Sequence, residues 1–438
     1  MSRVVVYTDK ITSRLKYVCS FIFQEVLKMP LLLTSNRSDL TGEDYRIGYS
    51  LKIMDGVFRI PPAGLLAENG IHEQDVPVVE RQEAPCLFPV SQGNIAFDAF
   101  SAIFYLLSRY EEYLPAERDQ FGRFPSTQSI AGKNRFLHIP VVNIWINELA
   151  DKLKEFYPDF PLPGAKTHFI PTIDIDNPWA FLNKPFCRVT GGILKDVVRL
   201  NMKHLSQRLK VLGKWEKDPF DSYDRIEKLH DPSLKIFYLL GHKSKRDNPV
   251  CPENYRWNQL IYKLSKKFSP GIHPSFHSSE NENLVKYEKE LLERITGKKI
   301  IASRQHFLKM TLPATYRNLL FNGIFEDYSM GYADQPGFRA GTSHSFFFYD
   351  LEIEETTPLR IFPFSLMDRT LKDYLGLSIS EAKELIAEQI STIRHYGGNF
   401  IPVWHNESLG TAAEWQGWNE VYEYMMNEAK TLSDQEGR

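Results

Sequence analysis

Cysteine is scarce in this sequence. Four cysteines occur in 438 residues, far apart and without a CxxC pair, at Cys19, Cys86, Cys187 and Cys251. That spacing argues against both a disulfide framework and a cysteine zinc site. Such sparing use of cysteine is typical of a reducing compartment.

Long apolar runs and an excess of one charge are also missing. No run approaches the roughly 18 apolar residues of a membrane span. The opening residues, MSRVVVYTDKITSRLKY, hold an apolar run of about four residues, whereas a secretory signal needs roughly 7–15. The 53 Lys and Arg nearly balance the 55 Asp and Glu, and the net charge of -2 gives no attraction to nucleic acid. We therefore expect a soluble cytoplasmic protein.

Length and composition predict more than one domain. A chain of 438 residues with 42% hydrophobic residues can fill two cores. The stretch YPDFPLPGAKTH, residues 157–168, holds three prolines and a glycine, as linkers do. We place a smaller N-terminal accessory α/β domain at residues 1–162 and a second domain at residues 163–438. In the first, we expect Arg109, Glu111 and Glu112 to form a structural charge cluster rather than a site.

Beyond this boundary, short apolar runs alternate with helical stretches. The runs are HFIPTIDID, LKIFYLLGH, FSPGIH, KKIIASRQH, GIFEDYS, LRIFPFSLMD and NFIPVWH. Between them stand stretches with helical spacing, such as ENYRWNQLIYKLSKKF, ENLVKYEKELLERI, LPATYRNLLFNG and SISEAKELIAEQISTIRHYGG. This alternation predicts a parallel α/β domain.

Every predicted strand ends in polar or ionisable side chains. They are Asp174, Asp176, His242, His273, Arg304, His306, Asp327, Asp368 and His405. The carboxyl ends of parallel strands meet at one edge, where barrels and open α/β sheets build their sites. We predict an α/β fold with a distorted (β/α)7 barrel after the smaller α/β N-terminal domain. An open doubly wound sheet is the second choice, because no GxGxxG or P-loop follows any strand.

The run TIDID places two carboxylates on one face of a strand. Asp174 and Asp176 are two residues apart, so both side chains point the same way. Adjacent carboxylates repel each other, and a cation or a shared proton relieves that repulsion. The alternative is a helix cap and a solvated turn residue, since DNP resembles a turn.

The stretch HPSFH supplies two imidazoles to the same edge. His273 ends a predicted strand, Pro274 stops that strand from continuing, and His277 follows on the loop before the next helix. Two histidines and an aspartate give three N and O ligands and leave a position for water. That is the arrangement of a catalytic metal site.

The order of these motifs resembles the polysaccharide deacetylase family, also known as the NodB-homology or carbohydrate esterase 4 group. The motifs read TIDID, HPSFH, SRQHF, EDYS and VWH and extend from about residue 167 to the C-terminus. The resemblance implies a distorted (β/α)7 barrel that removes acyl groups from N-acetylated sugars. The N-terminal part, with FYLLSRYEEYL and DQFGRF, is similar to the accessory domain of some Bacteroidetes-type members.

The resemblance also implies roles for individual residues. Asp176, His273 and His277 would hold a divalent metal, zinc by default, although cobalt, nickel or iron suit the same ligands. Asp174 would be the general base and His405 the general acid.

Two departures from the family pattern affect the expected orienting residue. Ile175 separates the two aspartates, which are usually adjacent, and His306 stands where a proline is usual after the arginine. Arg304 would orient Asp174, and Arg339 is its rival for that task. Candidates for substrate binding are Arg339, Tyr328, Trp404 and His306.

The expected activity is that of a metal-dependent hydrolase that removes N-acetyl groups from a sugar or glycan precursor. Two alternatives stay open: hydrolysis of a non-sugar amide at the same metal site, and a catalytically silent barrel that binds glycan. Residues 192–215 form a basic amphipathic stretch. We favour a solvated helix packed on the barrel there, with contact to a membrane surface as the less favoured alternative.

Overall fold

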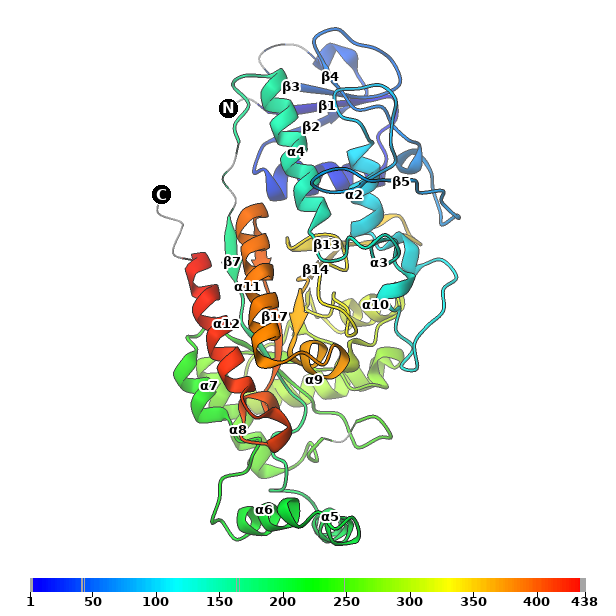
Figure 1. Ribbon diagram of the computed structural model, residues 1–438. Helices are drawn as coiled ribbons and strands as arrows, with labels where there is room; N and C mark the ends of the chain where they lie inside the picture. Colours follow the sequence, from blue (N-terminus) through cyan, green and yellow to red (C-terminus); the bar gives the residue numbers. More distant parts are fainter. Residues whose placement is uncertain are drawn as a thin grey trace.

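The N-terminal part is built on a small parallel sheet. The computed structural model describes residues 3–40, 42, 44–162, 164, 166–247 and 249–433. Strands β1 (Val4–Thr8), β2 (Leu31–Thr34), β3 (Tyr45–Tyr49) and β4 (Phe58–Arg59) form one sheet in the order β2–β1–β3–β4. All of its pairings are parallel. This sheet lies at one end of the molecule (Figure 1).

Helices cover this small sheet. Helix α1 (Ser13–Cys19) continues as a π-helix over Ser20–Val26, and α2 (Ala99–Leu107) is buried along its whole length. Helix α4 (Val141–Phe156) packs on α2, whereas the short helix α3 (Ile130–Lys133) lies away from this sheet, near β13 (Phe346–Asp350) (Figure 1). A hairpin joins β5 (Val78–Val79) and β6 (Cys86–Leu87).

A nine-stranded sheet forms the centre of the rest of the chain, in the order β13–β14–β12–β11–β10–β9–β8–β17–β15. Its strands are β8 (Thr172–Ile175), β9 (Lys235–Tyr238), β10 (Ser269–Ile272), β11 (Ala302–Ser303), β12 (Glu326–Asp327), β13 (Phe346–Asp350), β14 (Glu355–Ile361), β15 (Leu366–Met367) and β17 (Pro402–His405). Only β13 runs antiparallel to its neighbour. Strand β7 (Thr167–Phe169) pairs separately with β16 (Gly398–Phe400).

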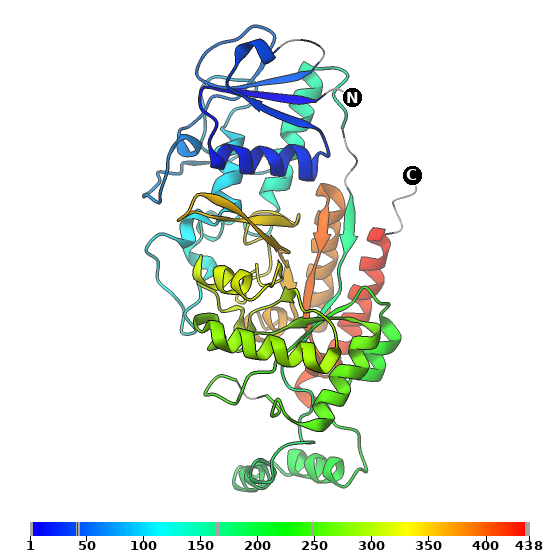
Figure 2. The same cartoon turned by 180° about the vertical axis from the view of Figure 1, so that it is seen from behind.

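Helices follow the strands, as the alternating pattern predicted. They are α7 (Tyr223–Leu229), α8 (Tyr255–Lys267), α9 (Glu282–Thr296), α10 (Ala314–Phe321), α11 (Ile379–Tyr396) and α12 (Trp418–Ser433). Local signals set their ends. Ser378 and Glu381 form a capping box at the start of α11, and Gly297 ends α9 in the left-handed conformation. Figure 2 shows the helices around the sheet from behind.

The large sheet is not closed, so the predicted distorted (β/α)7 barrel is confirmed only as a mixed α/β fold, without closure among the described residues. Among the described residues, no strand pairing joins the β13–β14 end of the sheet to β15 at the other end. Strand β13 occupies the free edge of β14, and the chain passes from Ile361 to Leu366 without a helix. The fold is thus a mixed α/β structure with one large, mainly parallel sheet.

The insertion after β8 also differs from its prediction. It forms two helices, α5 (Phe186–Val198) and α6 (Met202–Leu212), where one was expected. The break occurs because Leu200 has a positive φ of 54° and the side chain of Asn201 caps α6 by accepting from the His204 N–H. No helix of the described residues has the length and apolar character needed to cross a membrane.

Packing joins the N-terminal part to the large sheet. One hydrophobic cluster includes residues of both, such as Phe104 of α2 and Tyr349 of β13, whose ring centroids are 5.1 Å apart. Buried charges cross the same interface: Glu112 accepts from Arg339 at 2.6 Å. The predicted division between residues 162 and 163 falls at Pro163, which lies outside the described residues, and stays a prediction.

Candidate active site

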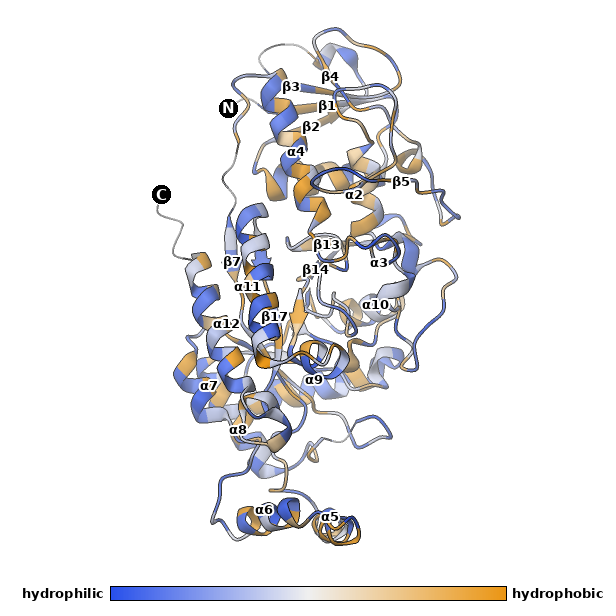
Figure 3. Ribbon diagram, in the orientation of Figure 1, coloured by the Kyte–Doolittle hydropathy of each residue, from blue (hydrophilic) through white to orange (hydrophobic). Residues whose placement is uncertain are grey.

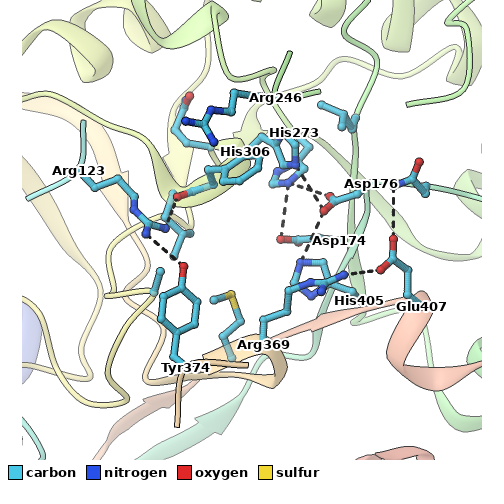
Figure 4. A pocket seen from close by; sticks show the side chains of 17 residues that line it. Arg123, Asp174, Asp176, Arg246, His273, His306, Arg369, Tyr374, His405 and Glu407 are labelled. Atoms are coloured by element: carbon cyan, nitrogen blue, oxygen red, sulfur yellow. Dashed lines mark hydrogen bonds and ion pairs between the residues drawn. The ribbon is translucent and has the colours of Figure 1, made fainter. Parts of the chain in front are cut away.

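The strand ends converge on one cavity. Parallel pairing brings Asp174 of β8 beside His405 of β17, while His273 and His306 follow β10 and β11. These four side chains and Asp176 line a cavity of about 300 Å³. Figure 4 shows the carboxylates and imidazoles pointing toward one another across it. The prediction that one sheet edge gathers these groups is confirmed for these five residues.

Asp176 lies between two histidines. Its Oδ1 is 3.2 Å from Nε2 of His273, and its Oδ2 is 3.4 Å from Nε2 of His306. One ligand atom from each of the three residues lies within 4.8 Å of the others. Both histidines are buried, and Asp176 is mostly so. The three side chains can therefore present one oxygen and two nitrogens to a common point.

Hydrogen bonds at Nδ1 fix how the two imidazoles face. Nδ1 of His273 is 2.5 Å from the carbonyl oxygen of Arg304, so it must donate. Nδ1 of His306 is 2.8 Å from Oδ1 of Asp247, which also accepts from the Phe276 N–H. With Nδ1 bound to its outer partner, each imidazole turns Nε2 toward Asp176, where Nε2 can carry a proton or, in the neutral ring, serve as a metal ligand. Metal-binding histidines are usually held in this way by an outer partner.

The pKa values of Asp176 and His306 are shifted by their closeness to each other. Burial alone would raise the pKa of Asp176, but the charge of His306 and the nearness of the Nε2 groups of His273 and His306 hold it well below its ordinary value. In return, and against the effect of burial, Asp176 and Asp247 raise the pKa of His306 to about 9. A proton on His306 or a cation between the three side chains can supply the positive charge that stabilises the Asp176 carboxylate.

The residues present fit a divalent metal. Two imidazole nitrogens and a carboxylate form the donor set of an open zinc-type site. Oδ1 of Asp176 is buried and has no partner of good hydrogen-bond geometry among the described residues, although Nε2 of His273 is near. A cation held by the three side chains would give this buried carboxylate oxygen a partner.

Asp174 is held beside this group by Arg304. Nη1 of Arg304 donates to Oδ1 of Asp174 at 2.8 Å and also to Thr172 at 2.8 Å. Arg304 is fully buried, and its guanidinium lies 4.6 Å from the centre of the Phe237 ring. The other oxygen of Asp174, Oδ2, is 3.9 Å from Nε2 of His273. Arg304, and not Arg339, therefore fixes the orientation of Asp174.

His405 stands on the other side of Asp176. Its Nδ1 donates to Oδ1 of Asp368 at 2.7 Å, and its Nε2 is 3.9 Å from Oδ2 of Asp176. Asp368 is itself held by Ser408 at 2.5 Å. Burial opposes a charge on the imidazole, but Asp368 raises the pKa of His405 to about 9. His405 is therefore protonated at neutral pH, with Nε2 toward the cavity.

His277 does not join this group. Its side chain is exposed, its ring packs against Phe276, and it does not line the cavity. The chain turns at Pro274 and carries His277 outward to a 3-10 helix that begins at Ser278. The second histidine of the site is instead His306 from the next strand end. It was expected only to bind substrate, and its place two residues beyond Arg304, at the end of the next strand, was the signal available in the sequence.

Three further predicted residues lie away from the cavity. Arg339 is buried against Glu112, with its Nη1 on the carbonyl oxygen of Gly331. Tyr328 stacks on Phe362 in a small apolar cluster, and its hydroxyl donates to Glu326. Trp404 is fully buried against Trp418 and Tyr422. The structure gives none of these three a place in the cavity wall.

Several residues that line the cavity were not predicted from the sequence. Arg369 pairs with Glu407, and both line the cavity. Arg123 reaches in from the N-terminal part, where its Nη2 donates to the hydroxyl of Tyr374 at 3.2 Å. Arg246 lies over the Phe121 ring at 4.7 Å. These residues come from loops and from a distant stretch of chain, where no periodic pattern marks them.

Comparison with known proteins gives limited matches. A family model described as a family of unknown function (DUF7033) matches residues 4–158. No curated protein matches the chain. Among solved structures, one described as a "putative polysaccharide deacetylase" from Mycobacterium smegmatis has 15% identity and a TM-score of 0.39, covering 63% of this chain and 87% of its own.

Two other solved structures match in the same range. A polysaccharide deacetylase from Bacillus cereus has 8% identity and a TM-score of 0.29, covering 61% of this chain and 89% of its own. A 4-alpha-glucanotransferase from Thermococcus litoralis has 12% identity and a TM-score of 0.33, covering 63% of this chain and 38% of its own.

Proposed function

We propose that this protein is a metal-dependent hydrolase that removes N-acyl groups, N-acetyl in the simplest case, from a sugar or glycan precursor. One observation carries the proposal: Asp176, His273 and His306 gather in one cavity with Asp174 on Arg304 and His405 on Asp368. The order of the sequence motifs, which resembles the polysaccharide deacetylases, points to the same chemistry.

Asp176, His273 and His306 would hold the metal, and zinc is the first choice for this donor set. Cobalt, nickel or iron suit the same ligands. When bound, the cation would lower the pKa of a bound water toward about 7 and polarise the acyl carbonyl. Compared with the sequence-based prediction, His306 takes the ligand role of His277.

Asp174 is the proposed general base. Arg304 holds its Oδ1 at 2.8 Å, which leaves Oδ2 facing the cavity 3.9 Å from His273 Nε2. Oδ2 can take a proton from the attacking water as the new C–O bond forms. Arg304 keeps the carboxylate in this orientation and acts as a positioning residue.

His405 is the proposed general acid. An amine leaves poorly as an anion, so a proton must reach the nitrogen as the C–N bond breaks. His405 carries this proton on Nε2, and Asp368 keeps the imidazole charged through Nδ1. The C–O bond forms and the C–N bond breaks, and the products are a carboxylic acid and an amine, since the proton taken by Asp174 balances the one given by His405. The acid then passes its proton to the amine or to solvent.

Acetate release tests the proposal. The purified chain, stripped with a chelator and reloaded with zinc or cobalt, is given N-acetylglucosamine oligomers and, in parallel, N-acetylated amino acids. We expect acetate from the sugars only after reloading, and a loss of about 100-fold or more in Asp174→Asn. Release from the amino acids alone would show that the substrate is a non-sugar amide and not a sugar. If the protein bound metal but released acetate from neither substrate, the remaining interpretation would be a catalytically silent binding protein.

A further inference from the structure

The insertion between β8 and β9 projects from the body of the molecule. Helices α5 and α6 pack mainly on each other and lie at the end opposite the small N-terminal sheet (Figures 1 and 2). Residues 186–217, which we call the hairpin segment, contain both helices. This arrangement replaces the sequence-based expectation of a helix packed on the body of the fold.

The hairpin segment has a defined structure. Asp196 of α5 bonds to His204 at 2.8 Å and to Arg208 at 2.7 Å, both on α6. At its base, the Asp218 carboxylate accepts hydrogen bonds from the backbone N–H groups of residues 180–182. The two helices are thus locked to each other, and the ends of the segment are held together.

The surface of the hairpin segment is unusually apolar. Eight of the twenty exposed large hydrophobic side chains of the described residues lie within it, namely Phe186, Leu194, Val197, Val198, Leu200, Met202, Leu209 and Trp215. Trp215 and Leu200 are each 81% exposed. Figure 3 shows apolar residues, in orange, on both helices. Single exposed apolar side chains are ordinary, but such a concentration marks an interaction surface.

The same segment is strongly basic. It holds eight Lys and Arg but only two acids, in a chain whose net charge is -2. Both acids are engaged already, Asp196 with His204 and Arg208, and Glu216 with Lys210. Within the segment, Lys195, Arg199 and Lys203 therefore meet no free carboxylate among the described residues.

Exposed apolar side chains among unpaired basic ones are suited to contact with an anionic lipid surface. Interfacial helices combine Lys and Arg with Trp, Phe and Leu in this way, because the apolar groups enter the lipid while the cations meet anionic headgroups. A second copy that docked through its own hairpin segment would bring a like charge against the first. Nucleic acid would match the charge and leave the apolar side chains exposed.

We propose that the hairpin segment docks the protein on an anionic membrane surface. The segment begins soon after Asp176 and Asn177, which line the cavity, so it leaves the body at the same sheet edge. Docking therefore brings the cavity close to the lipid surface. The docking itself does not depend on the proposed hydrolase activity.

Vesicle flotation with the full chain tests this proposal. The probes are vesicles of phosphatidylcholine alone and of phosphatidylcholine with phosphatidylglycerol. We expect binding to the second kind only, and weaker binding as salt rises from about 0.1 to about 0.5 M. The double variant Leu200→Ser/Trp215→Ser and the triple variant Lys195→Gln/Arg199→Gln/Lys203→Gln should each bind about 10-fold more weakly or worse.

Matched variants outside the segment serve as controls. Leu51→Ser/Ile53→Ser removes two apolar side chains that are 71% and 73% exposed, and Lys286→Gln removes an exposed charge. Both should bind like the wild type, and circular dichroism should show that all variants are folded. Failure of the wild type to bind anionic vesicles would overturn the proposal. So would equal binding by the hairpin variants, or a dimer of the wild type that those variants abolish.

Discussion

At the residue scale, each ionisable group of the site is held by a partner on its far side. His273 is held by the carbonyl oxygen of Arg304, His306 by Asp247 and His405 by Asp368. These outer contacts turn three Nε2 atoms toward Asp176. The geometry of the site thus depends on residues such as Asp247 and Asp368, which do not line the cavity themselves.

Asp368→Asn tests one such contact through the pH profile. Asp368 raises the pKa of His405 to about 9, so the acid form, and with it kcat/KM, is lost only as pH rises through that value. An amide in place of the carboxylate removes the charge that opposes burial, so the pKa of His405 falls. In a plot of kcat/KM against pH, we expect the decline at high pH (the alkaline limb) to begin about one pH unit lower, or more.

The control for this profile is Asp373→Asn, an exposed carboxylate that pairs with Arg369 at 3.1 Å. It should leave the alkaline limb in place. An unchanged limb in Asp368→Asn would exclude His405 as the group that limits activity at high pH.

Sequence reasoning could predict part of the site at this scale. The positions of His273 and His405 followed from their places at strand ends, and the pairing of Arg304 with Asp174 was implied by the resemblance to the polysaccharide deacetylases. The ligand role could not be divided between His277 and His306, because spacing does not show how Pro274 turns the chain outward. Asp247 lies in a loop that carries no periodic signal.

At the element scale, close packing between strands positions the site. Gly271 of β10 lies so near Phe237 of β9 that an added Cβ would be 2.5 Å from its ring. That ring lies 4.6 Å from the guanidinium of Arg304, which holds Asp174. A chain of contacts thus links Gly271, through Phe237 and Arg304, to the proposed base Asp174.

Gly271→Ala is expected to disturb this packing. Overfilling the site should lower the free energy of unfolding by about 1–3 kcal/mol, measured by denaturant titration. It should also reduce kcat, because Phe237 must move against Arg304. The matched control is Gly191→Ala on α5, where a Cβ meets nothing within 4 Å. That change should leave kcat as it is and stabilise the helix by up to about 1 kcal/mol. Similar effects of the two substitutions would contradict the account.

The strands themselves were predictable at this scale, and the closure of the sheet was not. Each predicted apolar run contains a strand, since runs of buried residues with polar ends carry a clear local signal. The strand β13 was missed, although its pairing with β14 decides that the sheet stays open. Pairing between strands depends on contacts across the chain, which a local pattern does not report.

At the scale of the whole molecule, buried charges tie the N-terminal part to the large sheet. Glu112 accepts from Arg109 at 2.8 Å and from Arg339 at 2.6 Å, and all three are buried. Burial alone would raise the pKa of Glu112, but the two arginines lower it to about 2. The expectation of a structural charge cluster anticipated Arg109 and Glu112, but the sequence did not indicate that Arg339 completes it.

Glu112→Gln tests this connection. Loss of the carboxylate leaves two buried guanidinium groups short of a partner, so the free energy of unfolding should fall by about 3–5 kcal/mol. The control is Glu155→Gln, which removes the exposed partner of Lys152 and should change stability little. Guanidinium unfolding followed by far-UV circular dichroism measures both. Equal midpoints for the two variants would show that the cluster contributes nothing to stability.

Metal content tests the central claim most directly, because the proposed chemistry begins with a cation held by Asp176, His273 and His306. The measurement is elemental analysis of the purified chain after loading with zinc, beside His306→Ala and His277→Ala. The account predicts about one metal per chain in the wild type and in His277→Ala, and loss of the metal in His306→Ala. Metal kept by His306→Ala and lost by His277→Ala, or no metal in the wild type, would contradict it.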